Sequence, residues 1–237
     1  MSVSLQSKFD AIRKSFRSSL IERNNEIDVS LCALVCQEHA LFVGAPGTAK
    51  SLLADSICQW IGGEYFHVLV GRFTTTEELF GPISLAGLKN EKYVRVTDGR
   101  LPCAEVAFID EIFKSSSAIL NTLLQVLNER TFFNGTNVQC PLRLCVAASN
   151  EWPAEKELSA LFDRFLFRKS VRPVGSSRGV KNLLWKDDLT PKIVQPVTVK
   201  EVDQAHKEAA LLEVGKDARD AFEQIYRRLQ AGKIPVG

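Results

Sequence analysis

The chain has 237 residues, of which 45% are hydrophobic and 24% are charged, a balance ordinary for a soluble globular protein. This length predicts one full domain with its own core and a smaller second one. A net charge of +2, from 30 basic and 28 acidic residues, gives no electrostatic case for nucleic acid as the main partner. The six cysteines form no C-x-x-C pair, which argues against a zinc site.

No stretch of the sequence approaches the roughly 18 uninterrupted apolar residues of a membrane span. Residues 1–10 are polar and lack the apolar core of a signal peptide. We therefore expect a cytoplasmic protein with no membrane span.

The first third of the chain has the order helix, helix, strand, loop, helix. Apolar residues at roughly helical spacing predict an amphipathic helix over residues 5–20 and a second helix over 27–36. The apolar run 40–43 is typical of a strand, and a glycine-bearing loop separates it from the next helix. This is the context that a phosphate-binding loop needs. We predict that nucleotide is held by nine consecutive residues, namely Gly44, Ala45, Pro46, Gly47, Thr48, Ala49, Lys50, Ser51 and Leu52.

The expected chemistry of this loop depends on its glycines and on the two residues that open the helix. Backbone N–H groups freed by Gly44 and Gly47 can point at a β-phosphate, and the helix N-terminus adds partial positive charge. Lys50 would reach the β- and γ-phosphate oxygens, and Ser51 would ligate Mg²⁺. Ala49 departs from the pattern G-x-x-x-x-G-K-[ST], because it stands where the second glycine usually lies. The alternative is a plain strand, turn and helix.

A helix, a strand and an irregular insertion follow. Residues 52–61 are expected to be helical, and residues 65–70 form a strongly apolar strand. Within residues 74–79 a threonine is followed three positions on by a glutamate, which is the spacing of a capping box. Residues 81–97 are less regular, and their last five residues alternate as one arm of an exposed hairpin. This insertion is a candidate partner-facing element, with an ordinary solvated hairpin as the equal alternative.

The run from Val106 to Glu111 is the second chemical landmark, because four apolar residues precede two carboxylates. In a buried parallel strand these carboxylates fall at the carboxyl end of the sheet, where the phosphate-binding loop also opens. The spacing suits Asp110 as a direct or indirect partner of Mg²⁺. It suits Glu111 as the base that orients and polarises an attacking water. The alternative is a strand that ends in a solvated acidic turn.

A third candidate group follows a further strand. A helix is expected over residues 115–130, with leucines on one face, and Asn134-Gly135 marks a turn after it. Residues 143–148 are typical of a buried strand, which ends in Ser149, Asn150 and Glu151. At that strand end Asn150 could hydrogen-bond a γ-phosphate or the attacking water. A lone asparagine is more often a turn or helix-cap residue, so its position relative to the other two strands is what favours the catalytic role.

Arg164 and Arg168 lie four residues apart in an apolar background. Arginines are costly to bury without an anion, so each needs a carboxylate or a phosphate. Asp163 offers the plain structural partner. The functional alternative is that Arg164 projects from one subunit into a neighbour's nucleotide site as an arginine finger.

The composition shifts after Pro173, and we predict a domain boundary that divides the chain into residues 1–172 and 173–237. Residues 175–179 are typical of a linker. Residues 199–213 and 217–231 are expected to be helical.

Together these motifs resemble the core of an AAA+ ATPase, and over about residues 20–172 they resemble the MoxR family. The resemblance implies an α/β fold: a P-loop NTPase αβα core with a parallel sheet, followed by a small, incomplete α-helical lid. Alanine before the lysine is usual in that family, so the departure at Ala49 supports the resemblance. The stretch 108–130 is closest to the RavA branch.

The resemblance also implies ATP and Mg²⁺ as cofactors and a role for each candidate residue. Lys50 and Ser51 match the Walker A residues for nucleotide and Mg²⁺, and Asp110 and Glu111 match Walker B. Asn150 matches sensor 1. Arg164 matches the arginine finger, whereas Arg168 is left as a possible structural residue. The family further implies a hexameric ring, a helix-2 insertion around residues 81–97, and partners that carry von Willebrand factor A (vWA) domains.

Three functions from different classes are compatible with these residues. The first is an ATP-hydrolysing ring that remodels or helps to assemble a partner protein. The second is a nucleotide-dependent binding module with negligible turnover. The binding module is favoured because the sensor 2 arginine of the family is expected just past Gly237, which would make this chain a fragment or a natural short form. The intact Glu111 opposes the binding module. A small-molecule P-loop kinase is weaker, because Asn150 and Arg164 would be unexplained.

Overall fold

The computed structural model describes residues 4–153, 156–186 and 188–232. Its centre is a sheet of five strands in the order β3-β4-β7-β1-β8, with every neighbouring pair parallel. In chain order the strands are β1 Ala40–Val43, β3 Tyr65–Leu69, β4 Val106–Asp110, β7 Leu144–Ser149 and β8 Phe167–Ser170. The predicted α/β fold with a parallel sheet is therefore confirmed.

The sheet is the middle of three layers because its inner strands are apolar on both faces. All residues of β1 and β7 are buried, as are the first four of β4. Alternate side chains point to opposite faces, so Leu41 and Val43 belong to one hydrophobic cluster and Ala40 and Phe42 to the other. A parallel sheet buried on both sides needs helices on both sides.

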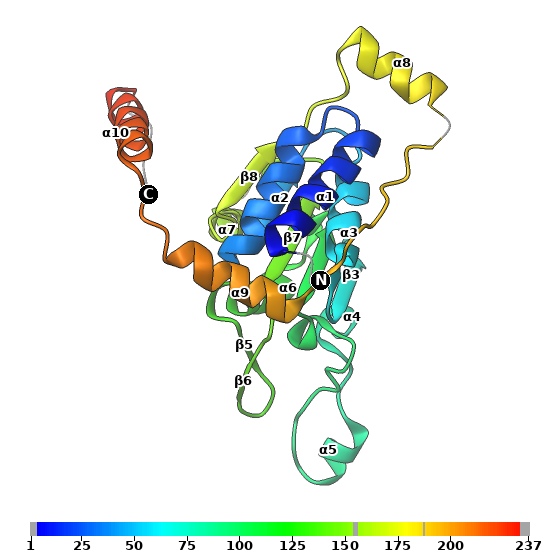
Figure 1. The fold of residues 1–237 in the computed structure, drawn as a ribbon. Coiled ribbons are helices and arrows are strands. Elements are labelled where there is room, and N and C mark those ends of the chain that lie inside the picture. The colour runs from blue at the N-terminus through cyan, green and yellow to red at the C-terminus, as the bar shows by residue number, and fades with distance from the viewer. Residues whose placement is uncertain (1–3, 154–155, 187, 233–237) are drawn as a thin grey trace.

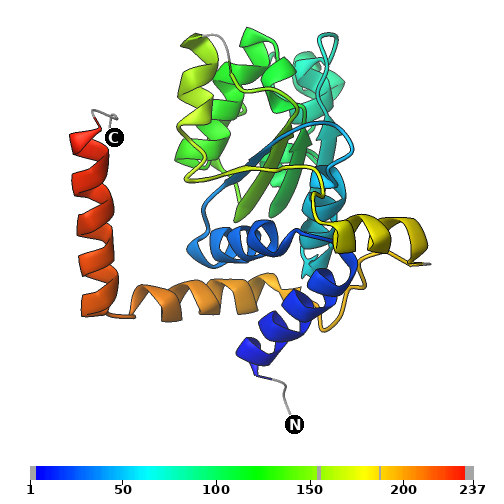
Figure 2. The same ribbon diagram turned by 90° about the horizontal axis from the view of Figure 1, so that it is seen from above.

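Two groups of helices supply these layers (Figures 1 and 2). One face is covered by α1 Leu5–Ser19, α2 Asn24–Cys36, α3 Lys50–Trp60 and α9 Val199–Ala210. The other is covered by α4 Thr76–Phe80, α6 Ser117–Leu124 with the π-helical turn η3 Gln125–Glu129, and α7 Lys156–Phe162. The capping box predicted at the start of α4 is present. None of the helices within the described residues is long and apolar enough to cross a membrane.

The predicted insertion projects from the core beside a small hairpin (Figure 1). Within this insertion Ile83 and Arg95 form a single antiparallel bridge, and the short helix α5 Leu85–Lys89 lies between them. The hairpin arm expected over residues 93–97 is therefore mostly irregular. The second hairpin joins β5 Thr131–Phe133 to β6 Asn137–Gln139 through the predicted turn. The Asn134 side chain in that turn accepts a hydrogen bond from the Arg95 backbone N–H (2.6 Å) and donates one to its carbonyl (3.1 Å).

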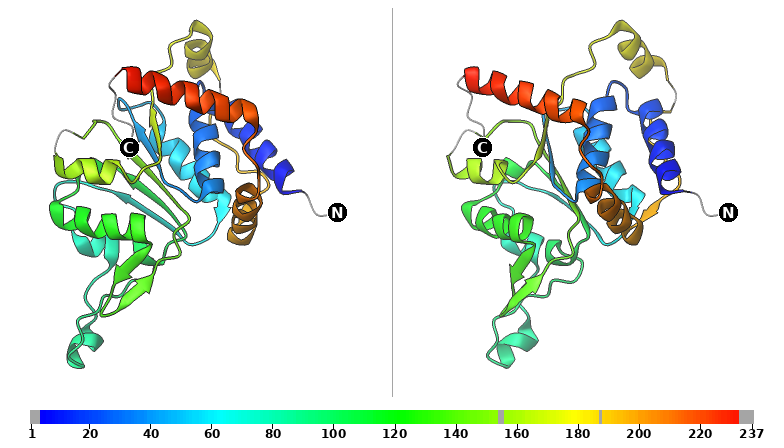
Figure 3. Two further views of the ribbon diagram at one scale, coloured as in Figure 1. Left: turned by 90° about the vertical axis from the view of Figure 1, so that its left-hand side faces the viewer. Right: turned by 60° about the vertical axis from the view of Figure 1, so that its left-hand side comes forward.

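The predicted linker is only partly a loop, because α8 Ser177–Trp185 begins inside it. The Ser176 hydroxyl accepts a hydrogen bond from the Gly179 N–H (2.9 Å), which caps the helix and explains its start. Helices α9 and α10 (Lys216–Ala231) match the two predicted last helices, and α10 buries no residue and stands apart from the sheet (Figures 2 and 3). The remaining elements are β2 Ile61–Gly62, paired with β9 Val197–Thr198, and the 3-10 turns η1 Leu101–Cys103 and η2 Ile112–Lys114.

A buried histidine at the start of β1 connects this strand to β7 and to η3. His39 precedes β1, and its ring accepts a hydrogen bond at Nδ1 from the Cys145 backbone N–H in β7 (3.0 Å). Its Nε2 lies 3.0 Å from the Leu127 carbonyl oxygen and also contacts the Arg130 guanidinium. Burial, with a smaller contribution from the Arg130 charge, lowers the pKa of His39 to about 3.

We predict that His39 makes the protein sensitive to mild acid. The unfolded imidazole titrates near 6.5 and the folded one near 3, so between these values the unfolded state binds one more proton. The unfolding free energy should therefore fall by about 1.4 kcal/mol per pH unit as the pH drops from about 6 to 4. Urea unfolding at several pH values measures this slope. His39→Gln should flatten it, whereas His67→Gln on the exposed face of β3 should not; equal slopes in all three proteins would contradict the assignment.

Candidate nucleotide-binding site

The strand order brings the three predicted motifs together. Because β7 lies between β1 and β4, the carboxyl ends of these strands are neighbours at one edge of the sheet. Val43 at the end of β1 pairs with Ser149 at the end of β7, and the Gly44 N–H donates to the Ser149 carbonyl (3.1 Å). Asp110 is the last residue of β4. The phosphate-binding loop, Asp110, Glu111 and Asn150 therefore meet at one place.

These residues line a cavity of about 280 Å³. Its lining consists of Pro46, Gly47, Thr48, Ala49, Lys50, Ser51 and Leu52 together with Asp110, Glu111 and Asn150. Gly44 and Ala45, the first two residues of the predicted loop, are not among the lining residues, and their carbonyls accept hydrogen bonds from the Lys50 ammonium (2.7 and 2.9 Å). A side chain at position 44 would collide with the segment that leaves β8, since a Cβ there would lie 2.1 Å from the Val171 carbonyl oxygen.

Lys50 is the buried cation of the site, with 6% of its surface exposed. Its ammonium also donates to the Asn150 side-chain oxygen (3.0 Å), which links the loop to the end of β7. Burial lowers the pKa of Lys50, and the carboxylates of Asp110 and Glu111 act in the opposite direction. A phosphate oxygen in this cavity would offer the ammonium a charged acceptor, which makes a stronger hydrogen bond than the two carbonyls.

Ser51 and Asp110 are in direct contact. The Ser51 hydroxyl donates to Asp110 Oδ2 at 2.7 Å, so the two residues predicted for magnesium lie side by side in the cavity. A hydroxyl and a carboxylate are hard oxygen donors, and Mg²⁺ in nucleotide sites is held by one or two such groups with phosphates and waters. The donor set therefore fits that ion.

Both carboxylate oxygens of Glu111 are engaged. Oε2 lies 3.3 Å from the Lys114 ammonium, and Oε1 accepts a hydrogen bond from the Asn150 side-chain amide. The backbone of Glu111 is left-handed, with φ of 54°, and its N–H donates to Asp110 Oδ1 (2.9 Å). This turn aims Glu111 across the cavity toward Asn150.

Ala49 adopts a left-handed conformation, with φ of 62°, at the start of α3. A Cβ in this conformation costs about 1–2 kcal/mol. Glycine avoids that cost, although its greater freedom in the unfolded chain offsets about 0.5–1 kcal/mol of the gain. The motif position that most often holds glycine is thus one where the backbone favours glycine.

We predict that Ala49→Gly stabilises the protein by about 0.5–1 kcal/mol. The physical reason is the relief of the left-handed strain, and the expected rise in melting temperature is about 2 °C. Thermal unfolding without nucleotide measures it. As a control, Ala118→Gly on the exposed side of α6 should lower stability by a similar amount, because its backbone is helical. If both variants were equally destabilised, the strain argument would be wrong.

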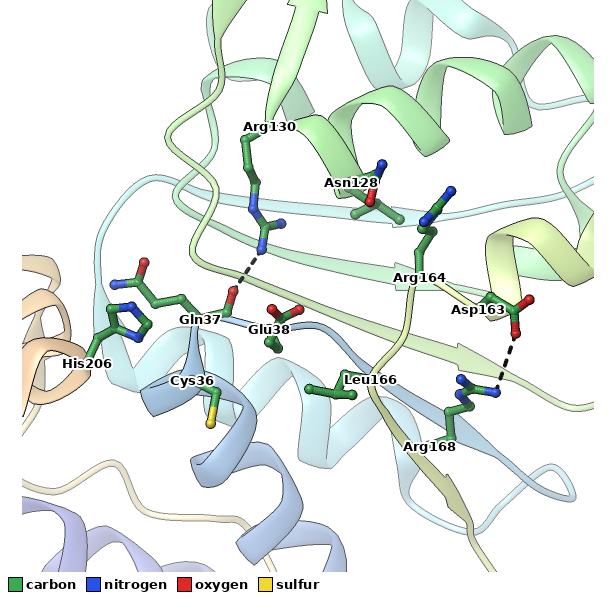
Figure 4. Close-up of a pocket in the computed structure, with 11 residues that line it drawn as sticks. Cys36, Gln37, Glu38, Asn128, Arg130, Asp163, Arg164, Leu166, Arg168 and His206 are labelled. Carbon is green, nitrogen blue, oxygen red and sulfur yellow. Dashed lines mark hydrogen bonds and ion pairs between the residues drawn. The ribbon is translucent and has the colours of Figure 1, made fainter. Parts of the chain in front are cut away.

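Arg164 lies away from this cavity, at the opposite edge of the sheet. It lines a second cavity of about 520 Å³ at the amino ends of β1 and β8, together with Arg130 and Arg168 (Figure 4). Arg168 has partners of its own chain: it pairs with Asp163 (3.7 Å), donates to the Phe165 carbonyl (2.7 Å) and lies over the Phe162 ring. Within one chain the structure therefore does not bring Arg164 to the nucleotide cavity, and it ties Arg168 into local packing.

Two residues near the site had no predicted role. Lys114 lies beside Glu111, three positions further along the chain, in the turn that follows β4. Arg23 is 4% exposed and donates to the Thr48 carbonyl of the loop (2.9 Å). The three-residue spacing could have indicated Lys114, whereas no local pattern indicates a contact between residues 23 and 48.

Comparison with known proteins agrees with this geometry. A family model described as the MoxR domain in the MoxR-vWA-beta-propeller ternary systems matches residues 7–207. An uncharacterized protein of Methanocaldococcus jannaschii is 43% identical over 230 residues, which cover 96% of this chain and 61% of that protein. The Mycobacterium tuberculosis chaperone MoxR1 is 25% identical over 181 residues, covering 73% of this chain and 46% of the chaperone.

A solved structure of a candidate ATPase from Cytophaga hutchinsonii has the same fold. It superposes with a TM-score of 0.66 at 15% identity, covering 90% of this chain and 66% of the other. The chain spans about half to three fifths of the length of the M. jannaschii relatives that it matches. Because the family model covers most of the sequence, including every residue of the candidate site, this chain belongs to the MoxR family.

Proposed function

We propose that this protein is a chaperone-like AAA+ ATPase that binds ATP and Mg²⁺ in the cavity of the phosphate-binding loop and hydrolyses ATP there. The observation that carries the proposal is the meeting of Lys50, Ser51, Asp110, Glu111 and Asn150, which come from three separate strand ends, around one cavity. Together these groups provide a cation for phosphate, oxygen donors for a metal, and a carboxylate for water.

Each residue has a distinct task in this proposal. The loop from Gly44 to Leu52 binds the nucleotide, and Lys50 contacts its phosphates. Ser51 and Asp110 hold Mg²⁺, which when bound neutralises charge on the β- and γ-phosphates. Glu111 orients the attacking water and accepts its proton, and Asn150 positions the water or the γ-phosphate.

The rest of the proposal concerns assembly. We propose that six subunits form a ring, as the family resemblance implies. In this ring Arg164 of one subunit enters the nucleotide cavity of its neighbour. Its place outside the nucleotide cavity of its own chain supports this role. A protein with a vWA domain is the proposed partner, supported by the description of the matching family. The RavA branch, the domain boundary near residue 173, the partial lid and the cytoplasmic location stay predictions.

A second candidate function is a nucleotide-dependent binding module with negligible turnover. The observation that favours it is the state of Glu111, whose two carboxylate oxygens are both occupied by Lys114 and Asn150. An attacking water must share a Glu111 oxygen with one of these donors or displace it, and both contacts weaken Glu111 as a base. In this function ATP would hold the protein in a partner-binding state without being consumed.

ATP turnover per subunit, measured over a wide range of protein concentration with Glu111→Gln as the blank, separates the two functions. A rate that rises steeply with concentration and then saturates is expected if sites form on assembly. Absence of turnover at every concentration, together with partner capture that requires ATP, would favour the binding module. If ATP does not bind at all, both functions are wrong.

A further inference from the structure

A buried arginine connects the phosphate-binding loop to two other segments. Arg23 lies at the turn between α1 and α2, and its guanidinium donates to three backbone carbonyls. Nε bonds Thr48 at 2.9 Å, Nη2 bonds Arg172 at 2.6 Å, and Nη1 bonds Glu22 at 2.7 Å. A cation that is 4% exposed is costly to bury, and these three hydrogen bonds offset part of that cost.

The bond to Thr48 determines which way the loop presents its amides. The peptide unit between Thr48 and Ala49 is planar and trans, so its N–H points away from its carbonyl. Arg23 holds the carbonyl on the outer side of the loop and does not line the cavity. The Ala49 N–H is therefore directed away from Arg23, and Ala49 itself lines the cavity. The amides of such a loop are what cradle a phosphate.

The bond to Arg172 gives the loop a rigid support. Arg172 directly follows Val171, whose carbonyl lies so close to Gly44 that only glycine fits there. Val171 in turn donates its N–H to the Val43 carbonyl (2.8 Å) at the end of β1. Arg23 thus connects Thr48, near the end of the loop, to the segment that leaves β8. Gly44, at the start of the loop, packs against the same segment.

Glu22 makes the matching connection to α8. Its carboxylate accepts hydrogen bonds from the backbone N–H groups of Gly175 (2.9 Å) and Ser176 (3.1 Å) and from the Ser176 hydroxyl. Gly179 in the first turn of α8 packs closely on Glu22, since a Cβ there would lie 2.4 Å from Oε1. Of these two adjacent residues, Arg23 therefore binds the phosphate-binding loop and Glu22 binds the start of α8.

We propose that Arg23 is a positioning residue for the phosphate-binding loop, and that Glu22 and Arg23 together transmit nucleotide occupancy of the loop to α8. Arg23 acts through the Thr48 carbonyl and touches no phosphate itself. The inference rests on the proposed function, because it requires that the loop binds nucleotide.

The test compares two neighbouring substitutions in the full chain. Binding of a non-hydrolysable ATP analogue with Mg²⁺ is measured by calorimetry after circular dichroism has shown that each variant is folded. Arg23→Lys keeps the charge but loses the planar fork, and should weaken binding about tenfold or more. Glu22→Ala leaves the Thr48 and Arg172 bonds in place, and should bind the analogue within about twofold of the wild type.

Hydrogen exchange in the wild type and in Glu22→Ala measures the second half of the proposal. In the wild type the analogue should slow amide exchange both in residues 47–51 and in residues 175–180. In Glu22→Ala it should slow exchange only in residues 47–51. Slowing confined to the loop in the wild type would overturn the coupling, and it can be observed even if the Arg23 variant does not fold. A folded Arg23→Lys with wild-type affinity would overturn the positioning role. Failure of the wild type to bind the analogue would instead refute the proposed function.

Discussion

Arg164→Ala should lower ATP turnover by about 10³-fold or more, because an arginine finger stabilises the charge that develops on the transferred phosphate. Binding of ATP to the variant should be nearly unchanged. The reason is that the variant keeps every residue lining the nucleotide cavity, and an arginine finger acts mainly on the charge of the transition state. Turnover at saturating protein concentration and ATP affinity by calorimetry measure the two quantities separately.

Arg168→Ala is the matched control for this prediction. Arg168 has the same side chain and lines the same cavity, but it is bound to Asp163 and to the Phe165 carbonyl. Its removal should reduce stability slightly and leave turnover within a few-fold of the wild type. Near-normal hydrolysis by Arg164→Ala, or equal losses in both variants, would refute a shared site built on Arg164.

Glu111→Gln should lower turnover by about 10²–10⁴-fold, the usual contribution of a general base. Glutamine matches glutamate in size and can still accept a hydrogen bond, so the turn after β4 should keep its shape. Lys50 and Ser51 are untouched, and ATP should therefore bind with near-normal affinity. Single-turnover hydrolysis at saturating ATP measures the chemical step, and Glu151→Gln, on the exposed residue after Asn150, is the control.

Mixing the two inactive variants tests whether the site is shared. A subunit with Arg164→Ala keeps Glu111, and a subunit with Glu111→Gln keeps Arg164, so their contact can form one complete site. In randomly mixed rings with head-to-tail contacts, about one quarter of the sites should be complete. Recovery of a comparable fraction of wild-type turnover is expected. No recovery, with both variants shown to assemble together, would contradict a site built from Glu111 of one subunit and Arg164 of its neighbour.

The sequence by itself determined the features that depend on neighbours along the chain. The order of apolar run, glycine loop and helix identified the phosphate-binding loop, and the apolar run before Asp110 and Glu111 identified a buried strand with an acidic end. The capping box at Thr75 and Glu78 follows from a three-residue spacing, and it forms as predicted. Backbone periodicity and hydrogen bonds between near neighbours are local physics, so a sequence records them directly.

The sequence suggested that these strand ends meet, but the tertiary structure decided which contacts the distant groups make. Asn150 contacts Lys50 and Glu111 because β7 lies between β1 and β4, an order that no local pattern encodes. The left-handed backbone of Ala49, and the start of α8 inside the predicted linker, became visible only once the chain was packed.

Arg23 shows the same limit most clearly. Its value lies in three carbonyls, one next to it in sequence, one 25 residues away and one 149 residues away. A backbone carbonyl has no side-chain identity, so a sequence carries no mark of the residue that will bind it. The sequence therefore determined the chemical groups of this site, and the packing of the chain decided how those groups are held.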